Sequence, residues 1–287
     1  MASAVTLTNP DKVFWPDEGI TKGELFEYYR AVSPALLPHV RGRPLTVKRY
    51  PNGIEGETFY QKNAPKGTPE WVRTITLPAE SAKRDVAYVL CNDPRTLLWL
   101  GNLASIELHP WISRVDRLER PDWLVLDVDP PEGRFDLAVR TALVTNEVLE
   151  ELRLPGCAKT SGSKGVHVYV PLQRRYGYDV VRRAGAMIAE RVAEREPSLV
   201  TTDVKRATRG ERVYLDFTRV GMGAHVVAVY SPRARPGAPV SFPVPWKDLE
   251  RVDPGEFTLR TAPALIARRD PWPALCPPPQ SLPRELR

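Results

Sequence analysis

Residues 123–133 read WLVLDVDPPEG and combine the pattern of a buried strand with two acidic side chains. Four apolar residues surround Asp127 and Asp129, and two prolines end the run, which predicts a short buried strand followed by a turn. Residues two apart on a strand share a face, so we expect the two carboxylates to point the same way, roughly 6–7 Å apart. Because like charges at that spacing repel, the pair predicts a cation between them.

The chain as a whole is long and moderately basic. Its 287 residues are enough to bury a large core, as one big domain or as two closely joined lobes. The 41 lysines and arginines exceed the 35 acidic residues, which leaves a net charge of +6. This excess favours a polyanionic partner, with nucleic acid and nucleotides ahead of an acidic membrane surface.

Cysteine usage and the N-terminal sequence indicate where the protein works. Cys91, Cys157 and Cys276 are far apart in the sequence and form no C-x-x-C motif, so neither a disulfide framework nor a zinc site is predicted. The N-terminus has no apolar signal segment, and no run of about 18 apolar residues occurs anywhere. We therefore expect a cytoplasmic protein with no membrane association.

Four segments have the signals of helices. They are 20–32, 92–104, 135–154 and 178–196. In the first, Thr21 and Glu24 form a capping-box pattern, and in the second Asp93 followed by Pro94 is typical of a helix start. Apolar residues recur at spacings of three or four in the last two, which predicts amphipathic helices.

Strand-like segments lie between these helices, including 44–51, 58–65 and 213–220. Several are half-polar rather than continuously apolar, so we expect an α/β fold of the α+β-like kind, with mixed or antiparallel sheets flanked by helices. The proline-rich tail is predicted to be an extended strap over the surface.

A third acidic residue, Asp216, lies in the strand-like segment VYLDFTRV. Carboxylates on core strands need compensation, and divalent cations held by oxygen ligands supply it. Two metals about 3.5–4 Å apart, bridged by aspartates, are the machinery of nucleotidyl transfer. The alternative is that the three aspartates cap turns or pair with arginines.

The segment TSGSKGVHVYV, residues 160–170, contains a turn of small residues around Lys164. Its backbone N–H groups and the lysine suit an anion, although the Walker A spacing is absent. In the strand that follows, His167 and Tyr169 share one face. The alternative is an ordinary turn with no ligand.

Five motifs occur in order: ELHPW (107–111), LDVDPPEG (126–133), TSGSKGVHVYVPL (160–172), LDFTR (215–219) and YSPRAR (230–235). Together they resemble the polymerase domain of bacterial ATP-dependent DNA ligase D, a member of the archaeo-eukaryotic primase superfamily. The resemblance covers nearly the whole chain and implies a primase-type fold. It also implies one catalytic domain over residues 1–287, with a DNA 5′-phosphate-binding portion at about 1–90, a catalytic core at about 91–250 and an extended tail at about 270–287.

The resemblance further implies roles for individual side chains. Asp127, Asp129 and Asp216 are expected to be catalytic and to hold two divalent ions, manganese or magnesium. The expected contacts to an incoming NTP or dNTP are Lys48, His109, Ser161, Lys164, His167, Arg219 and Arg233. The expected ligands of a DNA 5′-phosphate are Asn9, Lys12 and Lys22, together with N–H groups at a helix N-terminus. Phe59 and Tyr60 are expected to stack on the template.

The activity implied is template-directed addition of nucleotides, NTPs by preference, to a primer 3′-hydroxyl at gaps or broken ends with a downstream 5′-phosphate. The resemblance places this work in non-homologous end joining in the cytoplasm, at the nucleoid. The chain is too short to include a ligase or nuclease module, so we expect a stand-alone polypeptide or an excised domain that meets Ku and a DNA ligase in trans.

Two other functions remain open. One is a primase that starts strands without a primer, which the apparent 5′-phosphate pocket disfavours. The other is a non-catalytic module that bridges DNA ends. A pure DNA binder gains nothing from three aspartates beside phosphate, so the acidic residues argue against this second alternative.

Overall fold

The chain divides into two units, each assembled from three stretches of sequence. The structure is a computed structural model and describes residues 5–79 and 84–287. Unit 1 combines Met1–Asp116, His225–Ser241 and Gly255–Asp270, and unit 2 combines Arg117–Ala224, Phe242–Pro254 and Pro271–Arg287. The single catalytic domain expected over residues 1–287 stays a prediction, and its residues 1–4 and 80–83 lie outside the described part of the chain.

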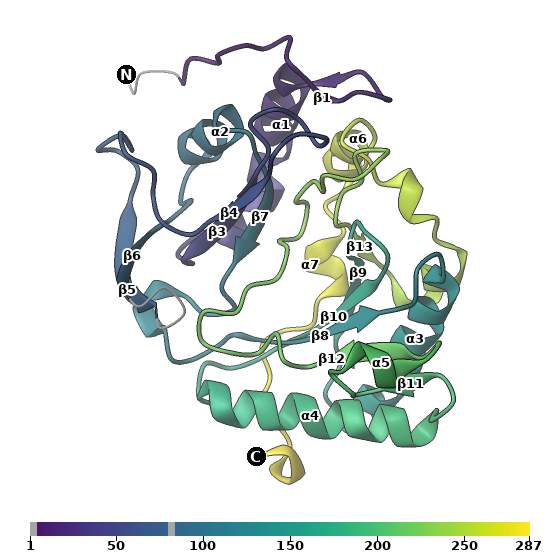
Figure 1. The fold of residues 1–287 in the computed structure, drawn as a ribbon. Helices are drawn as coiled ribbons and strands as arrows, with labels where there is room; N and C mark the ends of the chain where they lie inside the picture. Colours follow the sequence, from purple (N-terminus) through teal and green to yellow (C-terminus); the bar gives the residue numbers. More distant parts are fainter. Residues whose placement is uncertain (1–4, 80–83) are drawn as a thin grey trace. The chain divides into compact units, whose positions relative to one another are not determined.

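Unit 2 is built on a six-stranded sheet with β8 (Trp123–Asp129) inside it, as the pattern around Asp127 predicted (Figure 1). The strand order is β11-β12-β8-β10-β9-β13. The remaining strands are β9 (Cys157–Thr160), β10 (Val166–Pro171), β11 (Val200–Thr201), β12 (Val213–Asp216) and β13 (Pro243–Val244). The pair β11 and β12 is parallel and the other pairs of this sheet are antiparallel, so the sheet is mixed.

Two amphipathic helices cover this sheet, α3 (Phe135–Glu151) and α4 (Tyr178–Arg195). They pack against each other and against β8 and β10 (Figure 1). The apolar positions predicted for α4 face the core, since Val181, Ala184, Ile188 and Val192 have no exposed surface. Short helical segments elsewhere are η2 (Val115–Arg117), α5 (Arg206–Arg209), η3 (Trp246–Arg251), η4 (Pro254–Glu256), α7 (Trp272–Leu275) and η5 (Arg284–Leu286).

Unit 1 is built on a five-stranded antiparallel sheet and a separate strand pair. The larger sheet has the order β4-β3-β6-β5, and β7 also pairs with β3. Its strands are β3 (Leu45–Arg49), β4 (Phe59–Gln61), β5 (Thr74–Ala79), β6 (Arg84–Val89) and β7 (Ser105–Pro110). The strand pair is β1 (Val13–Trp15) with β2 (Ile20–Thr21).

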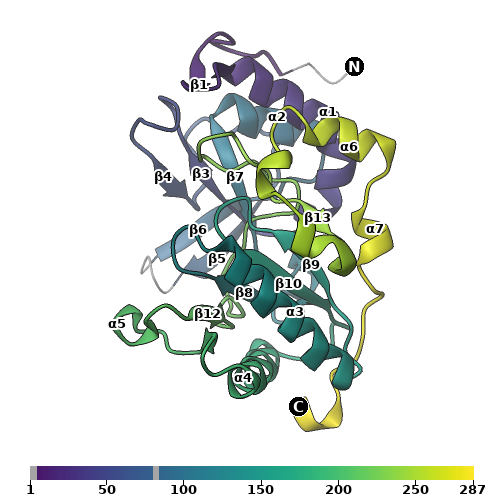
Figure 2. The same cartoon turned by 90° about the vertical axis from the view of Figure 1, so that its right-hand side faces the viewer.

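The helices of unit 1 begin where the capping signals predicted. Helix α1 (Lys22–Val40) has the capping box of Thr21 and Glu24, and α2 (Pro94–Asn102) has Asp93 as its N-cap. Helix α1 packs against α2 and against α6 (Ala262–Arg268) (Figure 2). It continues beyond the predicted segment despite two internal prolines. Burial of apolar side chains in its last turns offsets the cost of the prolines.

The C-terminal tail is not extended throughout, because it contains the short helices α7 and η5. Gln280 N–H donates to Pro171 O at 3.0 Å, and Gln173 N–H donates to Gln280 O at 2.7 Å, which fastens the tail beside the end of β10. The tail also brings Cys276 to Cys157, two free thiols whose sulfur atoms are 2.9 Å apart. Their separation in the sequence gave no sign of this contact. Within the described residues, no helix is long and apolar enough to cross a membrane.

We predict that Gly165→Ala destabilises unit 2. Gly165 begins the return into β10, and a Cβ atom there would lie 2.1 Å from the carbonyl oxygen of Val128 on β8. The strands must separate to admit it, so the free energy of unfolding should fall by about 2–3 kcal/mol. Denaturant unfolding measures this. Gly185→Ala, on α4, is the matched control and should be neutral or stabilising, because its new methyl group would lie 3.4 Å from Phe217 and 4.0 Å from Leu124, at ordinary contact distance.

Candidate functional site

The three predicted aspartates gather on one face of the sheet in unit 2. Asp127 and Asp129 lie on β8, and Asp216 ends the neighbouring strand β12 as the cross-strand partner of Asp127. Opposed residues on paired strands point to the same face, as do residues two apart on one strand. Strand pairing therefore brings together side chains that are 89 positions apart in the sequence (Asp127 and Asp216).

Asp216 is almost fully buried, and one of its oxygens is saturated by the protein. Oδ1 accepts hydrogen bonds from the hydroxyl of Tyr214 at 3.3 Å, from Thr218 N–H at 2.7 Å and from the Thr218 hydroxyl at 2.6 Å. These bonds fix the plane of the carboxylate and leave Oδ2 directed to Arg219.

Arg219 takes the cationic position between the carboxylates. Its Nε atom lies 3.4 Å from Asp127 Oδ2 and 3.1 Å from Asp216 Oδ2. This is the pairing with an arginine that the sequence left open as an alternative. In the described part of the chain, no group of three or more His, Cys, Asp or Glu side chains is arranged to hold a metal ion as it stands.

The same oxygens nevertheless suit a divalent cation. Oδ1 of Asp216 and Oδ1 of Asp127 are held by protein donors, and both Oδ2 atoms point to the guanidinium. Carboxylate oxygens are the ligands that magnesium and manganese prefer. The Arg219 side chain is 45% exposed, so it can move into solvent if a metal ion takes its place.

The two aspartates of β8 differ in their electrostatic surroundings. Burial raises the pKa of Asp129, and the negative charge of Asp127 raises it further. Burial acts the same way on Asp127, but His167, Arg219 and Lys159 outweigh it and hold its pKa below the usual range. The pKa values of neighbouring carboxylates separate in this way when the nearby positive charge cannot stabilise all of them as anions. The site therefore favours additional positive charge.

Lys159, a residue that the sequence analysis did not single out, lies on β9 and contacts His167. It has no exposed surface, and its Nζ atom lies 2.8 Å from Nδ1 of His167. An ammonium group donates and cannot accept, so Nδ1 accepts this bond and the ring proton sits on Nε2. That Nε2 lies 3.2 Å from Asp127 Oδ1. Lys159 and Asp127 together set the tautomer of His167, and the ring in turn holds one oxygen of the Asp127 carboxylate.

Three N–H groups of the small-residue turn are hydrogen-bonded within the turn. The Ser161 hydroxyl accepts hydrogen bonds of 3.1 Å from the N–H groups of Ser163 and Gly165, and Ser161 N–H donates to Gly165 O. The prediction that backbone N–H groups of this turn hold an anion is therefore wrong for these three groups, because a nearer acceptor occupies them. Lys164 is half-buried in the turn and remains a source of positive charge close to Asp129.

In unit 1, the predicted nucleotide contacts gather around Glu107, another residue that the sequence analysis missed. His109 Nε2 lies 3.1 Å from Glu107 Oε2, and Arg233 Nε lies 3.4 Å from the same oxygen. Lys48 is the cross-strand partner of Glu107, and its Nζ atom is 5.4 Å from the ring centre of Tyr60. The structure thus brings His109 and Arg233 together on one carboxylate, with Lys48 on the opposite strand.

The aromatic pair predicted to stack on a template is on the surface. Phe59 and Tyr60, on β4, are 44% and 55% exposed. The Tyr60 ring centre is 5.7 Å from that of His109, and the guanidinium carbon of Arg49 is 5.4 Å from the centre of Phe59. Exposed aromatic faces beside cationic side chains suit the stacking of bases.

The residues predicted to bind a 5′-phosphate lie together before and at the start of α1. Lys12 N–H donates to Asn9 O and Lys22 N–H donates to Lys12 O, while Lys12 Nζ donates to Asn52 Oδ1 at 2.7 Å. Lys22 is buried, and its Nζ atom donates to two oxygens of Thr8. Burial, reinforced by the charge of Lys12, lowers the pKa of Lys22.

The prediction that N–H groups at the start of α1 bind the phosphate is wrong. Lys22 N–H and Gly23 N–H donate to the carbonyl groups of Lys12 and Pro10, and Glu24 N–H donates to the Thr21 hydroxyl. The preceding turn and the capping box use the donors that a helix start leaves open. An anion here would have to be held by side chains.

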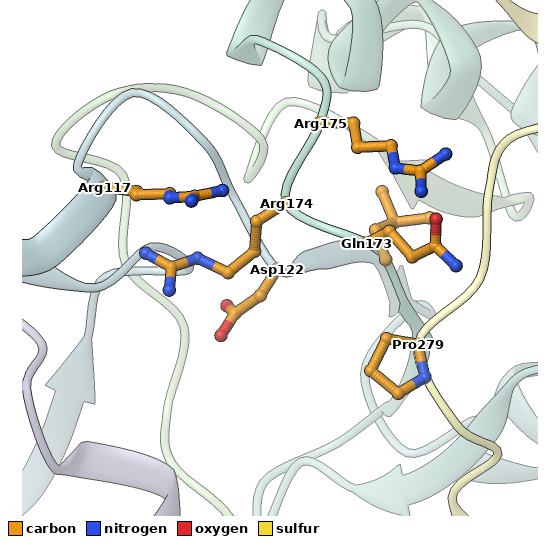
Figure 3. A pocket seen from close by; sticks show the side chains of 7 residues that line it. Arg117, Asp122, Gln173, Arg174, Arg175 and Pro279 are labelled. Carbon is orange, nitrogen blue, oxygen red and sulfur yellow. The ribbon is translucent and has the colours of Figure 1, made fainter.

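A pocket of about 430 Å³ in unit 2 lies away from the three aspartates, where β8 begins and β10 ends (Figure 3). Arg117 and Arg174 extend to the same side of it, and Arg175 points away. Asp122 adds an opposite charge, and Pro279 of the tail closes one side. The mixture of charges favours no particular ligand, so we do not include this pocket in the candidate site.

The two residues that the sequence analysis missed share a feature that could have identified them. Lys159 and Glu107 are charged residues inside short strands whose every position is buried. Glu107 is two residues from His109, and Lys159 is the cross-strand partner of His167. The first relation is visible in the sequence as a shared strand face, whereas the second appears only once β9 is paired with β10.

Comparisons with known proteins point to one family. A family model described as "LigD, primase-polymerase domain" matches residues 21–272. The "Multifunctional non-homologous end joining protein LigD" of Mycolicibacterium smegmatis is 34% identical over 252 residues, covering 85% of this chain and 32% of the relative. The "Bifunctional non-homologous end joining protein LigD" of Bacillus subtilis is 31% identical over 257 residues, covering 88% of this chain and 41% of the relative. The chain therefore spans less than half the length of these two relatives.

A solved structure is also similar. The "Polymerase Domain from Mycobacterium tuberculosis Ligase D in complex with DNA" matches with a TM-score of 0.86 at 29% sequence identity, covering 95% of this chain and 99% of that chain. The primase-type fold with mixed and antiparallel sheets, expected from the sequence, is confirmed.

We predict that Lys159→Met changes the hydrogen bonding of His167 at Nδ1. Methionine retains the apolar length of the side chain and removes the donor to Nδ1, whereas Asp127 still accepts from Nε2. Nitrogen NMR of the histidine rings should find the Nε2–H form in both proteins, with the Nδ1 resonance shifted in the variant because its donor is lost. The chain has four histidines, so His167→Gln identifies the signal and His39 serves as an internal control. An unchanged Nδ1 resonance of His167 in Lys159→Met contradicts the assignment.

Proposed function

Because this chain belongs to the LigD primase-polymerase family, we propose that it is a template-directed nucleotidyltransferase that extends a primer from its 3′-hydroxyl. The observation that carries the proposal is the convergence of Asp127 Oδ2 and Asp216 Oδ2 on one cationic position. Support comes from relatives named for non-homologous end joining and from a similar polymerase domain named as a complex with DNA.

In this proposal, Asp127, Asp129 and Asp216 hold two divalent ions. When bound, magnesium or manganese ions lower the pKa of the attacking hydroxyl and offset charge on the departing pyrophosphate. Arg219 leaves the carboxylates for the triphosphate, so that its positive charge stays within the site. His167, held by Lys159, keeps Asp127 in the orientation that presents Oδ2.

The incoming nucleotide is assigned to the side chains expected from the sequence. In unit 1 these are Lys48, His109 and Arg233, and in unit 2 they are Ser161, Lys164, His167 and Arg219. Cationic donors of this kind offset the charge of a triphosphate and of its leaving group. The preference for NTPs over dNTPs is part of the proposal and is supported by the family resemblance.

The DNA substrate is a gap or a broken end with a downstream 5′-phosphate. Phe59 and Tyr60 offer exposed rings to the template, and Asn9, Lys12 and Lys22 are assigned to the phosphate. The names of the relatives support a role in end joining. Action at the nucleoid in the cytoplasm, with Ku and a DNA ligase as partners, is part of the proposal and is supported by the family resemblance.

Primer extension on a short gapped duplex tests the catalytic proposal. The wild type should extend the primer with NTPs in preference to dNTPs in the presence of manganese. Asp127→Ala should lower the rate at least about 1000-fold, because it removes a ligand of the ions that stabilise the transition state. Asp136→Ala, which removes an exposed ion pair with Arg134, is the matched control and should extend normally. A wild type that binds the gap and extends nothing under either metal supports the end-bridging alternative instead.

The 5′-phosphate assignment has its own test. Extension by the wild type should be faster on gaps with a downstream 5′-phosphate than on gaps with a 5′-hydroxyl, and Lys12→Ala should remove most of that difference. Lys66→Ala, at an exposed lysine elsewhere in unit 1, should preserve it. If Lys12→Ala is stimulated by the phosphate as strongly as the wild type, Lys12 is not a ligand.

A further inference from the structure

The buried carboxylate of Glu107 contacts two of the predicted nucleotide-binding side chains of unit 1, His109 and Arg233. It lies on β7, whose residues are all buried, and is 3% exposed. Its Oε2 atom faces His109 Nε2 at 3.1 Å and Arg233 Nε at 3.4 Å. Its Oε1 atom accepts hydrogen bonds from the Tyr50 hydroxyl at 3.2 Å and from Ala234 N–H at 3.3 Å.

We propose that Glu107 is a positioning residue, which holds His109 and Arg233 in the geometry that binds the incoming nucleotide. The inference rests on the proposed function, because it takes these two side chains as nucleotide contacts. Glu107 itself is not assigned a contact with the nucleotide.

The charge of Glu107 suits this role better than a structural one. An ionised carboxylate in a buried strand is unfavourable unless charged donors surround it, and an apolar residue would be the simpler choice for packing. Burial raises the pKa of Glu107, but His109, Arg233 and the Ala234 N–H outweigh it and hold the pKa well below the usual range. The carboxylate is therefore an anion and acts as an acceptor on both oxygens.

An anionic Glu107 also determines the state of His109. A carboxylate can only accept, so Nε2 of His109 must carry its proton toward Oε2. Burial lowers the pKa of His109 despite this partner, which keeps the ring neutral. The imidazole is thereby held in one tautomer and one orientation.

The same carboxylate holds Arg233 in place from another part of the chain. Lys48 is directly opposite Glu107 on β3, where residues of paired strands share a face. Arg233 reaches Glu107 from a segment 126 residues later (233 and 107) and is kept there by the adjoining Ala234 N–H bond. Without the anion, the arginine would lose its fixed approach. A triphosphate would then have to order these side chains itself.

The test measures nucleotide affinity and catalysis separately in Glu107→Gln, which keeps the shape of the side chain and removes its charge. We expect KM for the nucleotide to rise at least about tenfold, since the ionic hydrogen bond to His109 and the ion pair with Arg233 are lost. The change in kcat should be smaller, and affinity for gapped DNA should stay the same. Glu107→Asp, which restores the anion, should recover part of the affinity. Glu151→Gln, which breaks an exposed pair with Arg195, is the matched control.

A double-variant comparison identifies the route of the effect. If Glu107 acts through Arg233, Glu107→Gln should weaken nucleotide binding much less in an Arg233→Ala background than in the wild type. Additive losses, an unchanged KM in Glu107→Gln, or loss of folding in both Glu107 variants would each reject the positioning role. If the wild type fails to extend primers, the proposed function fails, and direct titration with NTP still tests whether Glu107 supports nucleotide binding.

Discussion

The candidate sites in both units depend on one constraint, which is that a buried carboxylate must be neutralised by nearby donors. Asp216 and Asp127 each have one oxygen tied to the protein and one directed to Arg219. In unit 1, Glu107 divides its two oxygens among four donors. An unpaired carboxylate in these strands would cost several kcal/mol, so its partners are held in place as firmly as the strand itself.

Histidine is used in the same way in both units. His167 lies between a buried lysine and an aspartate, and His109 is held by a buried glutamate. In each case the partner on one ring nitrogen determines where the proton sits, and therefore what the other nitrogen offers. The two arrangements differ in one respect, because His167 has both a cation and an anion as partners, whereas His109 is held by an anion. Neither ring depends on a bound ligand for its orientation.

Backbone groups contribute less to the candidate site than the sequence suggested. The turn around Lys164 uses three of its N–H groups internally, and the start of α1 uses three more in its cap and preceding turn. In the turn around Lys164, the small residue Gly165 permits a close approach of β10 to β8 and does not form an open anion-binding loop. The side chains of lysine and arginine are therefore the main source of positive charge for a phosphate, and they can move when a ligand arrives.

The sequence by itself determined the local elements and the identity of the acidic residues. Capping signals located the starts of α1 and α2, and the apolar run around Asp127 predicted β8, because these patterns depend on neighbours within a few positions. The tertiary structure alone decided the pairing of Asp127 with Asp216, the placement of Arg219 between them, and the contact of Cys157 with Cys276. It also revealed Lys159 and Glu107, since a charged residue in a short strand has no recognisable role until its partners are known. The physical reason is that propensity and capping act along the chain, whereas charge compensation in a core acts across strands that the sequence does not order.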